Sequence, residues 1–103
     1  MSLTGKQLNY LRGLAHHRNV VVAVGGPGLT QSVVNDIDRA LAHHELVKIK
    51  LAISDRDERR SCVTRICKRT AAHSVQQIGR VAVVYRAAKD PKIVLPGIFN
   101  AEC

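Results

Sequence analysis

The residues best suited to chemistry in this sequence form a short turn, Gly25-Gly26-Pro27-Gly28. Its three glycines lack the side chain that keeps another backbone at a distance, and Pro27 limits the freedom of the turn. Thr30 follows at a position where its hydroxyl can cap a helix. Free backbone N–H groups beside a helix N-terminus favour an anion, most commonly a phosphate. A purely structural turn would explain the same residues.

The turn matches neither of two familiar phosphate-binding loops. No Gly-Lys-Ser or Gly-Lys-Thr follows Gly28, as a Walker loop requires. The third glycine of the dinucleotide-binding fingerprint is missing, and so is the acidic residue beyond a second strand. The remaining type is the clamp of KH domains, in which a glycine loop lies against the nucleic-acid backbone.

The composition favours a polyanionic partner. The chain of 103 residues has 16 Lys and Arg against 8 Asp and Glu, which gives a formal net charge of +8. With 46% hydrophobic residues the chain is expected to fold, as one domain without a second core. Tyr10, Tyr85 and Phe99 are the only aromatic residues apart from histidines, which argues against rows of aromatic side chains stacking on bases.

A second basic feature is the helix predicted over residues 56–72. Five basic side chains lie mostly on one arc of it: Arg59, Arg60, Arg65, Lys68 and Arg69. Arginine suits bidentate contact with phosphate, so Arg59 and Arg60 are candidate RNA-binding residues. A solvated helix face would look the same. Whether this face shares a ligand with the glycine turn is left open.

Metal and catalytic sites are not indicated. His16-His17 and His43-His44 point about 100° apart on a helix, so neither doublet chelates a metal alone. A position beside helix-terminal carbonyls explains these histidines better. No nucleophile elbow or zinc motif is present. We expect no enzymatic activity, no metal, no cofactor and no small-molecule substrate.

The cysteines and the apolar runs bear on the compartment. Cys62, Cys67 and Cys103 are an odd number without CxxC spacing, and the first two fall on the apolar side of a helix as free thiols. No apolar run approaches the length of a bilayer span, and the N-terminus lacks a signal-peptide pattern. A reducing, cytoplasmic location without membrane contact is the resulting expectation.

Alternating helices and strands must position these residues. Helices are predicted over residues 4–17, 31–44 and 56–72, and strands over 20–24, 46–52, 74–78 and 81–86. The β-branched run 20–24 is typical of a buried strand, and 46–52 alternates apolar with basic residues. Gly79-Arg80 suits a tight hairpin. The pattern predicts an α/β fold, a two-layer sandwich in the order α-β-α-β-α-β-β, with a four-stranded mixed sheet.

The end of the chain differs in composition from the rest. Residues 87–103 contain charge, Pro91 and Pro96, and the short apolar run Ile93-Val94-Leu95. We expect Ile93 and Leu95 to dock against the body and the chain to fray afterwards. The predicted organisation is one domain over residues 1–96 and a tail over 97–103.

Several segments in register resemble the CRM domain family (chloroplast RNA splicing and ribosome maturation). They are Leu11-Arg12-Gly13-Leu14-Ala15-His16, Val24-Gly25-Gly26-Pro27-Gly28-Leu29-Thr30, His44-Glu45-Leu46-Val47-Lys48-Ile49-Lys50, Ile78-Gly79-Arg80, Val84-Tyr85-Arg86 and Lys92-Ile93-Val94-Leu95-Pro96. The match covers about residues 3–96 in the order of the family. The length is similar to that of the stand-alone bacterial, YhbY-type members.

The resemblance implies a fold similar to the C-terminal domain of translation initiation factor 3, and RNA binding without catalysis. Bacterial members of the family are associated with precursors of the large ribosomal subunit. The GxxG loop of the family maps onto Gly25, Gly26, Pro27 and Gly28, with Thr30 after it. Nearby basic residues complete the candidate site: Lys6, Arg12, His16 and Arg18, with Lys48 and Lys50, whose role could be partly structural.

Two hypotheses of function follow. The first is a monomeric RNA-binding protein that holds rRNA of the precursor large subunit through phosphate contacts. The alternative is a protein-interaction factor whose basic faces and tail bind an acidic partner in ribosome assembly or translation. The sequence does not name the RNA or the assembly step.

Overall fold

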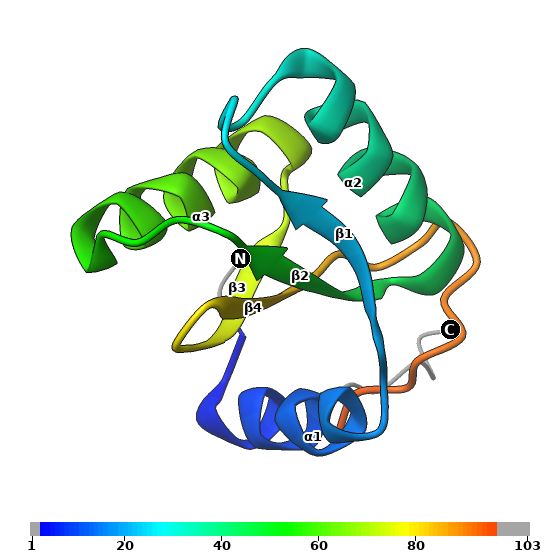
Figure 1. Cartoon of the computed structure of the whole chain (residues 1–103). Helices are drawn as coiled ribbons and strands as arrows, with labels where there is room; N and C mark the ends of the chain where they lie inside the picture. Colours follow the sequence, from blue (N-terminus) through cyan, green and yellow to red (C-terminus); the bar gives the residue numbers. More distant parts are fainter. Residues whose placement is uncertain (1–2, 97–103) are drawn as a thin grey trace.

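The computed structural model describes residues 3–96, which form three helices and four strands (Figure 1). In chain order they are α1 (Gly5–His16), β1 (Val20–Val24), α2 (Gln31–His44), β2 (Leu46–Leu51), α3 (Arg56–Thr70), β3 (His73–Ile78) and β4 (Val81–Tyr85). The predicted α/β order is confirmed, and the predicted ends differ by at most two residues. At the end of α3, Ala71 adopts a left-handed conformation (φ 57°) that stops the helix.

The four strands form one mixed sheet in the order β1-β2-β4-β3. β1 and β2 are parallel, whereas β4 is antiparallel to both of its neighbours. Val24 therefore lies opposite Leu51, and Lys50 lies opposite Val81. As a result, three connections lie at the same end of the strands: residues 25–30, 52–55 and 79–80. We call this end of the sheet the loop edge.

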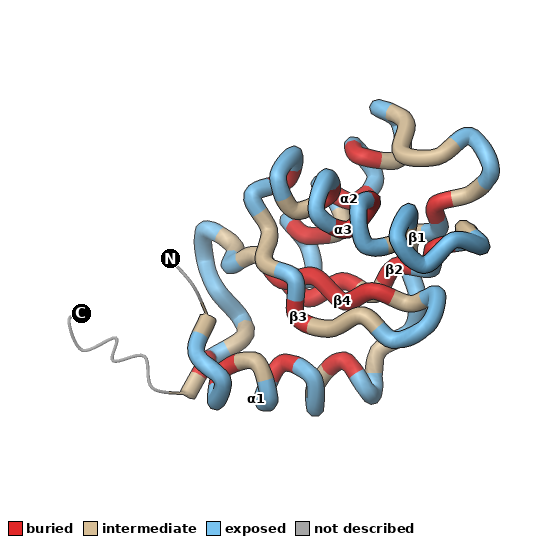
Figure 2. The backbone as a smooth tube through the Cα atoms, turned by 90° about the vertical axis from the view of Figure 1, so that its left-hand side faces the viewer, coloured by how far each residue is buried: buried red, intermediate tan, exposed pale blue. Residues whose placement is uncertain are grey.

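Helices cover both faces of the sheet (Figure 2). α2 and α3 enclose a core with one face, built from Val24, Ile37, Leu41, Val47, Ile49, Leu51, Cys62, Val63, Ile66, Ala82 and Val84. α1 encloses a second core with the other face, built from Leu11, Ala15, Leu46, Val75, Val83, Tyr85 and Leu95. The structure thus adds a third layer to the expected two. The reason is that the apolar stripe of α1 also needs a sheet face to cover.

β1 differs from its prediction as a buried strand. It is an edge strand, in which only Val24 is buried while Val20 and Val21 are 42% and 53% exposed. α1 packs mainly against β2, β3 and β4, so one face of β1 stays uncovered. A β-branched run cannot by itself distinguish a central strand from an edge strand.

Side chains cap the N-termini of α1 and α3. Thr4 and Gln7 form a capping box at the start of α1, and Asp55 caps α3 by accepting the N–H of Glu58 at 2.9 Å. The docking of Ile93 and Leu95 is also confirmed, because both join the α1 core. The predicted tail over 97–103 lies outside the described residues, and the domain boundary at 96 stays a prediction.

Candidate nucleic-acid interface

The glycine loop is a hydrogen-bonded turn at the loop edge. The N–H of Gly28 donates to the carbonyl of Gly25 at 2.9 Å, and Gly28 has a φ of +82°, which glycine adopts without strain. Gly26 and Pro27 are exposed at its tip, and a Cβ added at Gly26 would meet no atom within 4 Å. The tip is therefore open to a large partner.

Part of the expected set of free amides is already used. Gly28 donates within the turn, and the N–H of Thr30 donates to the carbonyl of Gly28 at 3.1 Å. The N–H groups of Gly26 and Leu29 donate to no acceptor within residues 3–96. The loop thus offers fewer donors than its sequence suggested, because a tight turn satisfies some of its own amides.

The N-terminus of α2 supplies the remaining donors. The Thr30 hydroxyl accepts the N–H of Val33 at 3.2 Å, which confirms the predicted cap. Gln31 and Ser32 lie in the first turn, where helical geometry gives their N–H groups no acceptor within the helix. The positive end of the helix dipole adds to them. The loop tip and this helix end together suit a phosphate.

A hollow of about 670 Å³ lies between the loop and the start of α3, and its charge is mixed. Asp55 and Glu58 line it together with Arg65, the three loop glycines and Cys62. Two carboxylates against one guanidinium repel an anion. A phosphate is therefore better placed at the α2 side of the loop than inside this hollow.

Two of the predicted RNA-binding residues are engaged inside the protein. Arg18 donates from its guanidinium to the carbonyls of His44 and Leu46, at 3.5 and 3.4 Å. Lys48 donates from Nζ to the carbonyls of Ala15 and Arg18, at 3.3 and 3.4 Å. These cations neutralise the carbonyl ends of α1 and α2, a role that helix dipoles favour.

Arg12, His16 and Lys48 line a groove of about 330 Å³ between α1 and the sheet. Arg12 is held there by Nε, which donates to the carbonyl of Val75 at 3.3 Å. Lys50 is exposed on the same sheet face, closer to the loop edge. Lys50 thus lies on the α1 side of the sheet, nearer than Lys48 to the end of β1 from which the glycine loop begins.

Lys6 is not brought to this surface. It lies in the first turn of α1, whose neighbours Leu3 and Leu8 line a small pocket with His73 and Ser74. His73 begins β3, at the end of the strands opposite the loop edge. Lys6 therefore stands apart from the other candidates.

The basic face of α3 divides into two parts. Arg59 and Arg60 lie in its N-terminal half, where they line a pocket with the β3–β4 hairpin at the loop edge. Arg59 also donates to the carbonyls of Ile53 and Ser54, at 2.7 and 2.8 Å. Lys68 and Arg69 belong to the last turn, at the other end of the helix. Arg65, which lies between these two parts, lines the hollow beside the glycine loop.

Glu45 is a residue whose role the sequence reasoning missed. It is 1% exposed, has a φ of 62°, and its carboxylate accepts the N–H groups of Ala88, Lys92 and Ile93 at 2.8–3.0 Å. Burial alone would raise its pKa, but these three bonds and the charge of Lys92 lower the pKa below the ordinary value. An acidic residue after a helix gives no signal in the sequence that its carboxylate will accept hydrogen bonds from a distant segment of the backbone.

The thiols behave as predicted for core residues. Cys62 is buried and Cys67 half-buried, and both are free. Burial raises the pKa of each thiol, which keeps it protonated.

Residues 3–96 hold no group of three or more His, Cys, Asp or Glu side chains placed to share a metal ion. In the same part of the chain, no helix is long and apolar enough to cross a bilayer.

These features define a small α/β domain with a net positive charge and an exposed glycine loop at the loop edge. The model of the CRS1 / YhbY (CRM) domain matches residues 3–86, and the chain belongs to this family. The predicted resemblance is therefore confirmed.

Relatives and a solved structure agree with the assignment. The "RNA-binding protein" of Haemophilus influenzae is 46% identical over 92% of this chain and 96% of its own length. The "Probable RNA-binding protein PA4753" of Pseudomonas aeruginosa is 41% identical over 89% of this chain and 86% of its own. The solution structure of SAV1595 from Staphylococcus aureus superposes with a TM-score of 0.81, at 34% identity, covering 91% of this chain and 99% of that one.

Proposed function

We propose that this protein binds RNA without catalysing a reaction, and that its target is rRNA of the precursor large ribosomal subunit. The main support for RNA binding is that the relatives, which align over nearly the whole chain, are named RNA-binding proteins. The formal net charge of +8 is consistent with a polyanionic partner. The ribosomal target rests on the resemblance to bacterial members of the family.

The glycine loop would act as the clamp on the RNA backbone. A phosphate at the loop tip would meet the N–H groups of Gly26 and Leu29 and those of the first turn of α2. Lys50 beside the loop, and Arg12 and His16 in the groove, would add attraction along the strand. Because phosphate contacts position a nucleic acid without reading its bases, we expect modest sequence discrimination.

A salt series tests this proposal. The purified protein is titrated with fragments of large-subunit rRNA and with duplex DNA at several salt concentrations. We expect RNA to bind more tightly, and log affinity to fall linearly with log salt by about 0.7 per contacted phosphate on single strands. Equally weak binding of RNA and DNA would contradict the proposal. The acidic protein partner would then become the better hypothesis.

A further inference from the structure

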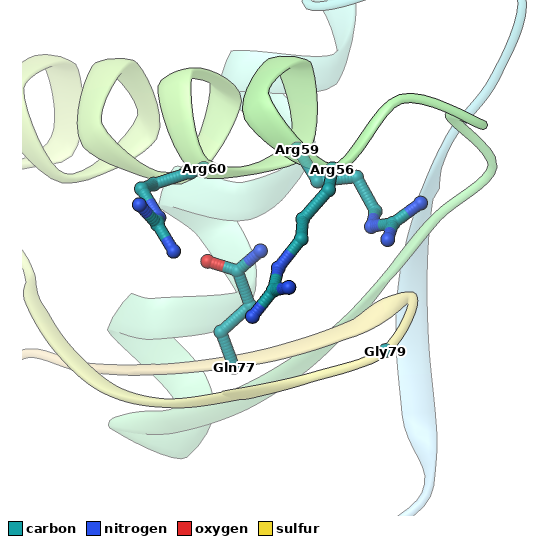
Figure 3. Close-up of a pocket in the computed structure, with 5 residues that line it drawn as sticks. All are labelled: Arg56, Arg59, Arg60, Gln77 and Gly79. Carbon is teal, nitrogen blue, oxygen red and sulfur yellow. The ribbon is translucent and has the colours of Figure 1, made fainter.

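A pocket of about 460 Å³ opens between α3 and the β3–β4 hairpin, separate from the glycine loop. Its lining consists of Arg56, Arg59, Arg60, Gln77 and Gly79. Figure 3 shows Arg60 and Gln77 pointing into the space between helix and hairpin from opposite sides. We call this the arginine pocket.

The arginine pocket carries positive charge without a carboxylate in its lining. None of the ion pairs within the described chain involves Arg56, Arg59 or Arg60. The acids at the start of α3 that shape the loop hollow, Asp55 and Glu58, do not line this pocket. Clustering three guanidinium groups without a counter-charge is unfavourable, and an anion would relieve that repulsion.

A second observation points to a missing acceptor. The Nε of Arg59 is buried and has no hydrogen-bond partner within residues 3–96. The same guanidinium is fixed in place, because its Nη1 donates to the carbonyls of Ile53 and Ser54. A buried donor without an acceptor costs free energy, and an oxygen-bearing ligand that reached this nitrogen on binding would remove that cost.

The size and place of the pocket indicate which anion. Its volume exceeds the roughly 30 Å³ that one water occupies in the liquid by more than tenfold, so a sugar-phosphate unit fits. It lies at the loop edge, because the carbonyl of Arg80 in the hairpin accepts the N–H of Leu51 at 2.6 Å. Arginine binds phosphate bidentately, and the Gln77 amide offers both a donor and an acceptor to a sugar.

We propose that the arginine pocket holds a backbone phosphate of the RNA that also contacts the glycine loop. This inference rests on the proposed function and adds a second anchor to it. The strand would cross the β2–α3 connection, residues 52–55, between the two anchors. Two separated phosphate sites fix the path of a strand across the surface, which one site cannot do.

The test removes two positive charges from the pocket and compares the effect on RNA binding with that of removing two positive charges elsewhere on α3. The pocket variant is R56Q/R60Q, since both side chains are exposed and make no bond with another group within residues 3–96. Arg59 is left unchanged because it supports the Ile53 and Ser54 carbonyls.

The control is K68Q/R69Q, which removes the same charge from exposed positions in the last turn of α3. Thermal unfolding confirms that both variants fold. RNA affinity is measured over the salt series, and the amide resonances of Gln77 and Gly79 are followed by NMR during RNA titration.

The pocket variant is expected to bind large-subunit rRNA fragments about tenfold more weakly than the control does, with a salt slope smaller by about 0.7 for one lost phosphate. In wild type, the resonances of Gln77 and Gly79 should shift with RNA. Equal affinity and slope in pocket and control variants, with these resonances unmoved, overturn the inference. Wild-type protein that fails to bind RNA overturns the proposed function instead, so the two failures are distinguishable.

Discussion

At the scale of single residues, the surface combines groups that are free to meet a ligand with groups already used by the fold. Gly26 and Pro27 belong to the first kind, since both are exposed. Lys48 and Arg18 belong to the second, since each donates to two carbonyls. This division gives opposite expectations for substitutions that look alike in sequence.

Replacing both loop-tip residues, G26D/P27D, should weaken RNA binding more than tenfold. Two carboxylates beside a phosphate repel it by about 1 kcal/mol each, even in water-like surroundings. The fold should persist because a side chain at position 26 has open space. Fluorescence anisotropy with labelled rRNA fragments measures the effect.

The matched control for the loop is G5D/G13D. Both glycines lie on α1 with no atom within 4 Å of an added Cβ, and the change in net charge is the same. Similar affinity losses in the two variants would mean that the loop contributes only general charge.

Lys48→Met should lower stability and leave RNA affinity within about twofold. Methionine keeps the apolar stem but loses the donations to the carbonyls of Ala15 and Arg18, at a cost of about 1 kcal/mol. Urea unfolding gives the change in free energy, and the anisotropy titration gives the affinity. A large loss of RNA binding in a stable variant would return Lys48 to the interface.

At the scale of elements, Glu45 joins the end of α2 to the segment that follows β4. Its carboxylate accepts three backbone N–H groups from that segment, while its own carbonyl accepts the N–H of Arg86 at 2.9 Å. The segment then covers α1, where Gln7 donates to the carbonyl of Pro96 at 3.2 Å. The hydrogen bonds of Glu45 therefore support the α1 core.

Glu45→Gln should lower the free energy of unfolding at pH 7 by about 2 kcal/mol, because the amide cannot accept all three N–H groups. The pKa of Glu45 is lowered in the folded protein, so this stabilisation is present above the unfolded pKa, near 4.5, and is lost as the pH falls through the folded value. Chemical unfolding of both proteins from pH 7 to pH 3 should show the difference shrinking. A constant difference would exclude the charged carboxylate as its source.

At the scale of the whole molecule, the sequence predicted most of the architecture and part of the surface. The cap at Thr30, the apolar face of α2 and the alternation of β2 are local signals, so the order of elements followed from them. The third layer did not, because the alternation of apolar and basic residues in β2 gives no sign that α1 covers the face that carries Lys48. A sequence shows a charge but not the carbonyl of the same chain that neutralises it.

The arginine pocket was beyond sequence reasoning for a related reason. Arg59 and Arg60 were selected by their charge, but their opposing wall is Gln77, a neutral residue from a hairpin that follows α3. Nothing in the local pattern around Gln77 indicates a ligand. Its role depends on the antiparallel register that brings the hairpin to the loop edge.

The exposed edge strand β1 has a consequence for behaviour in solution. An edge strand presents unpaired backbone donors and acceptors that can pair with the same strand of another copy, and exposed Val20 and Val21 would favour such pairing. A formal charge of +8 on each copy opposes it by mutual repulsion, which dissolved salt screens. Rising ionic strength thus lowers the affinity for RNA and at the same time weakens the repulsion that opposes self-association. Bound RNA, which neutralises the same charge, would also weaken the repulsion between neighbouring copies on one transcript.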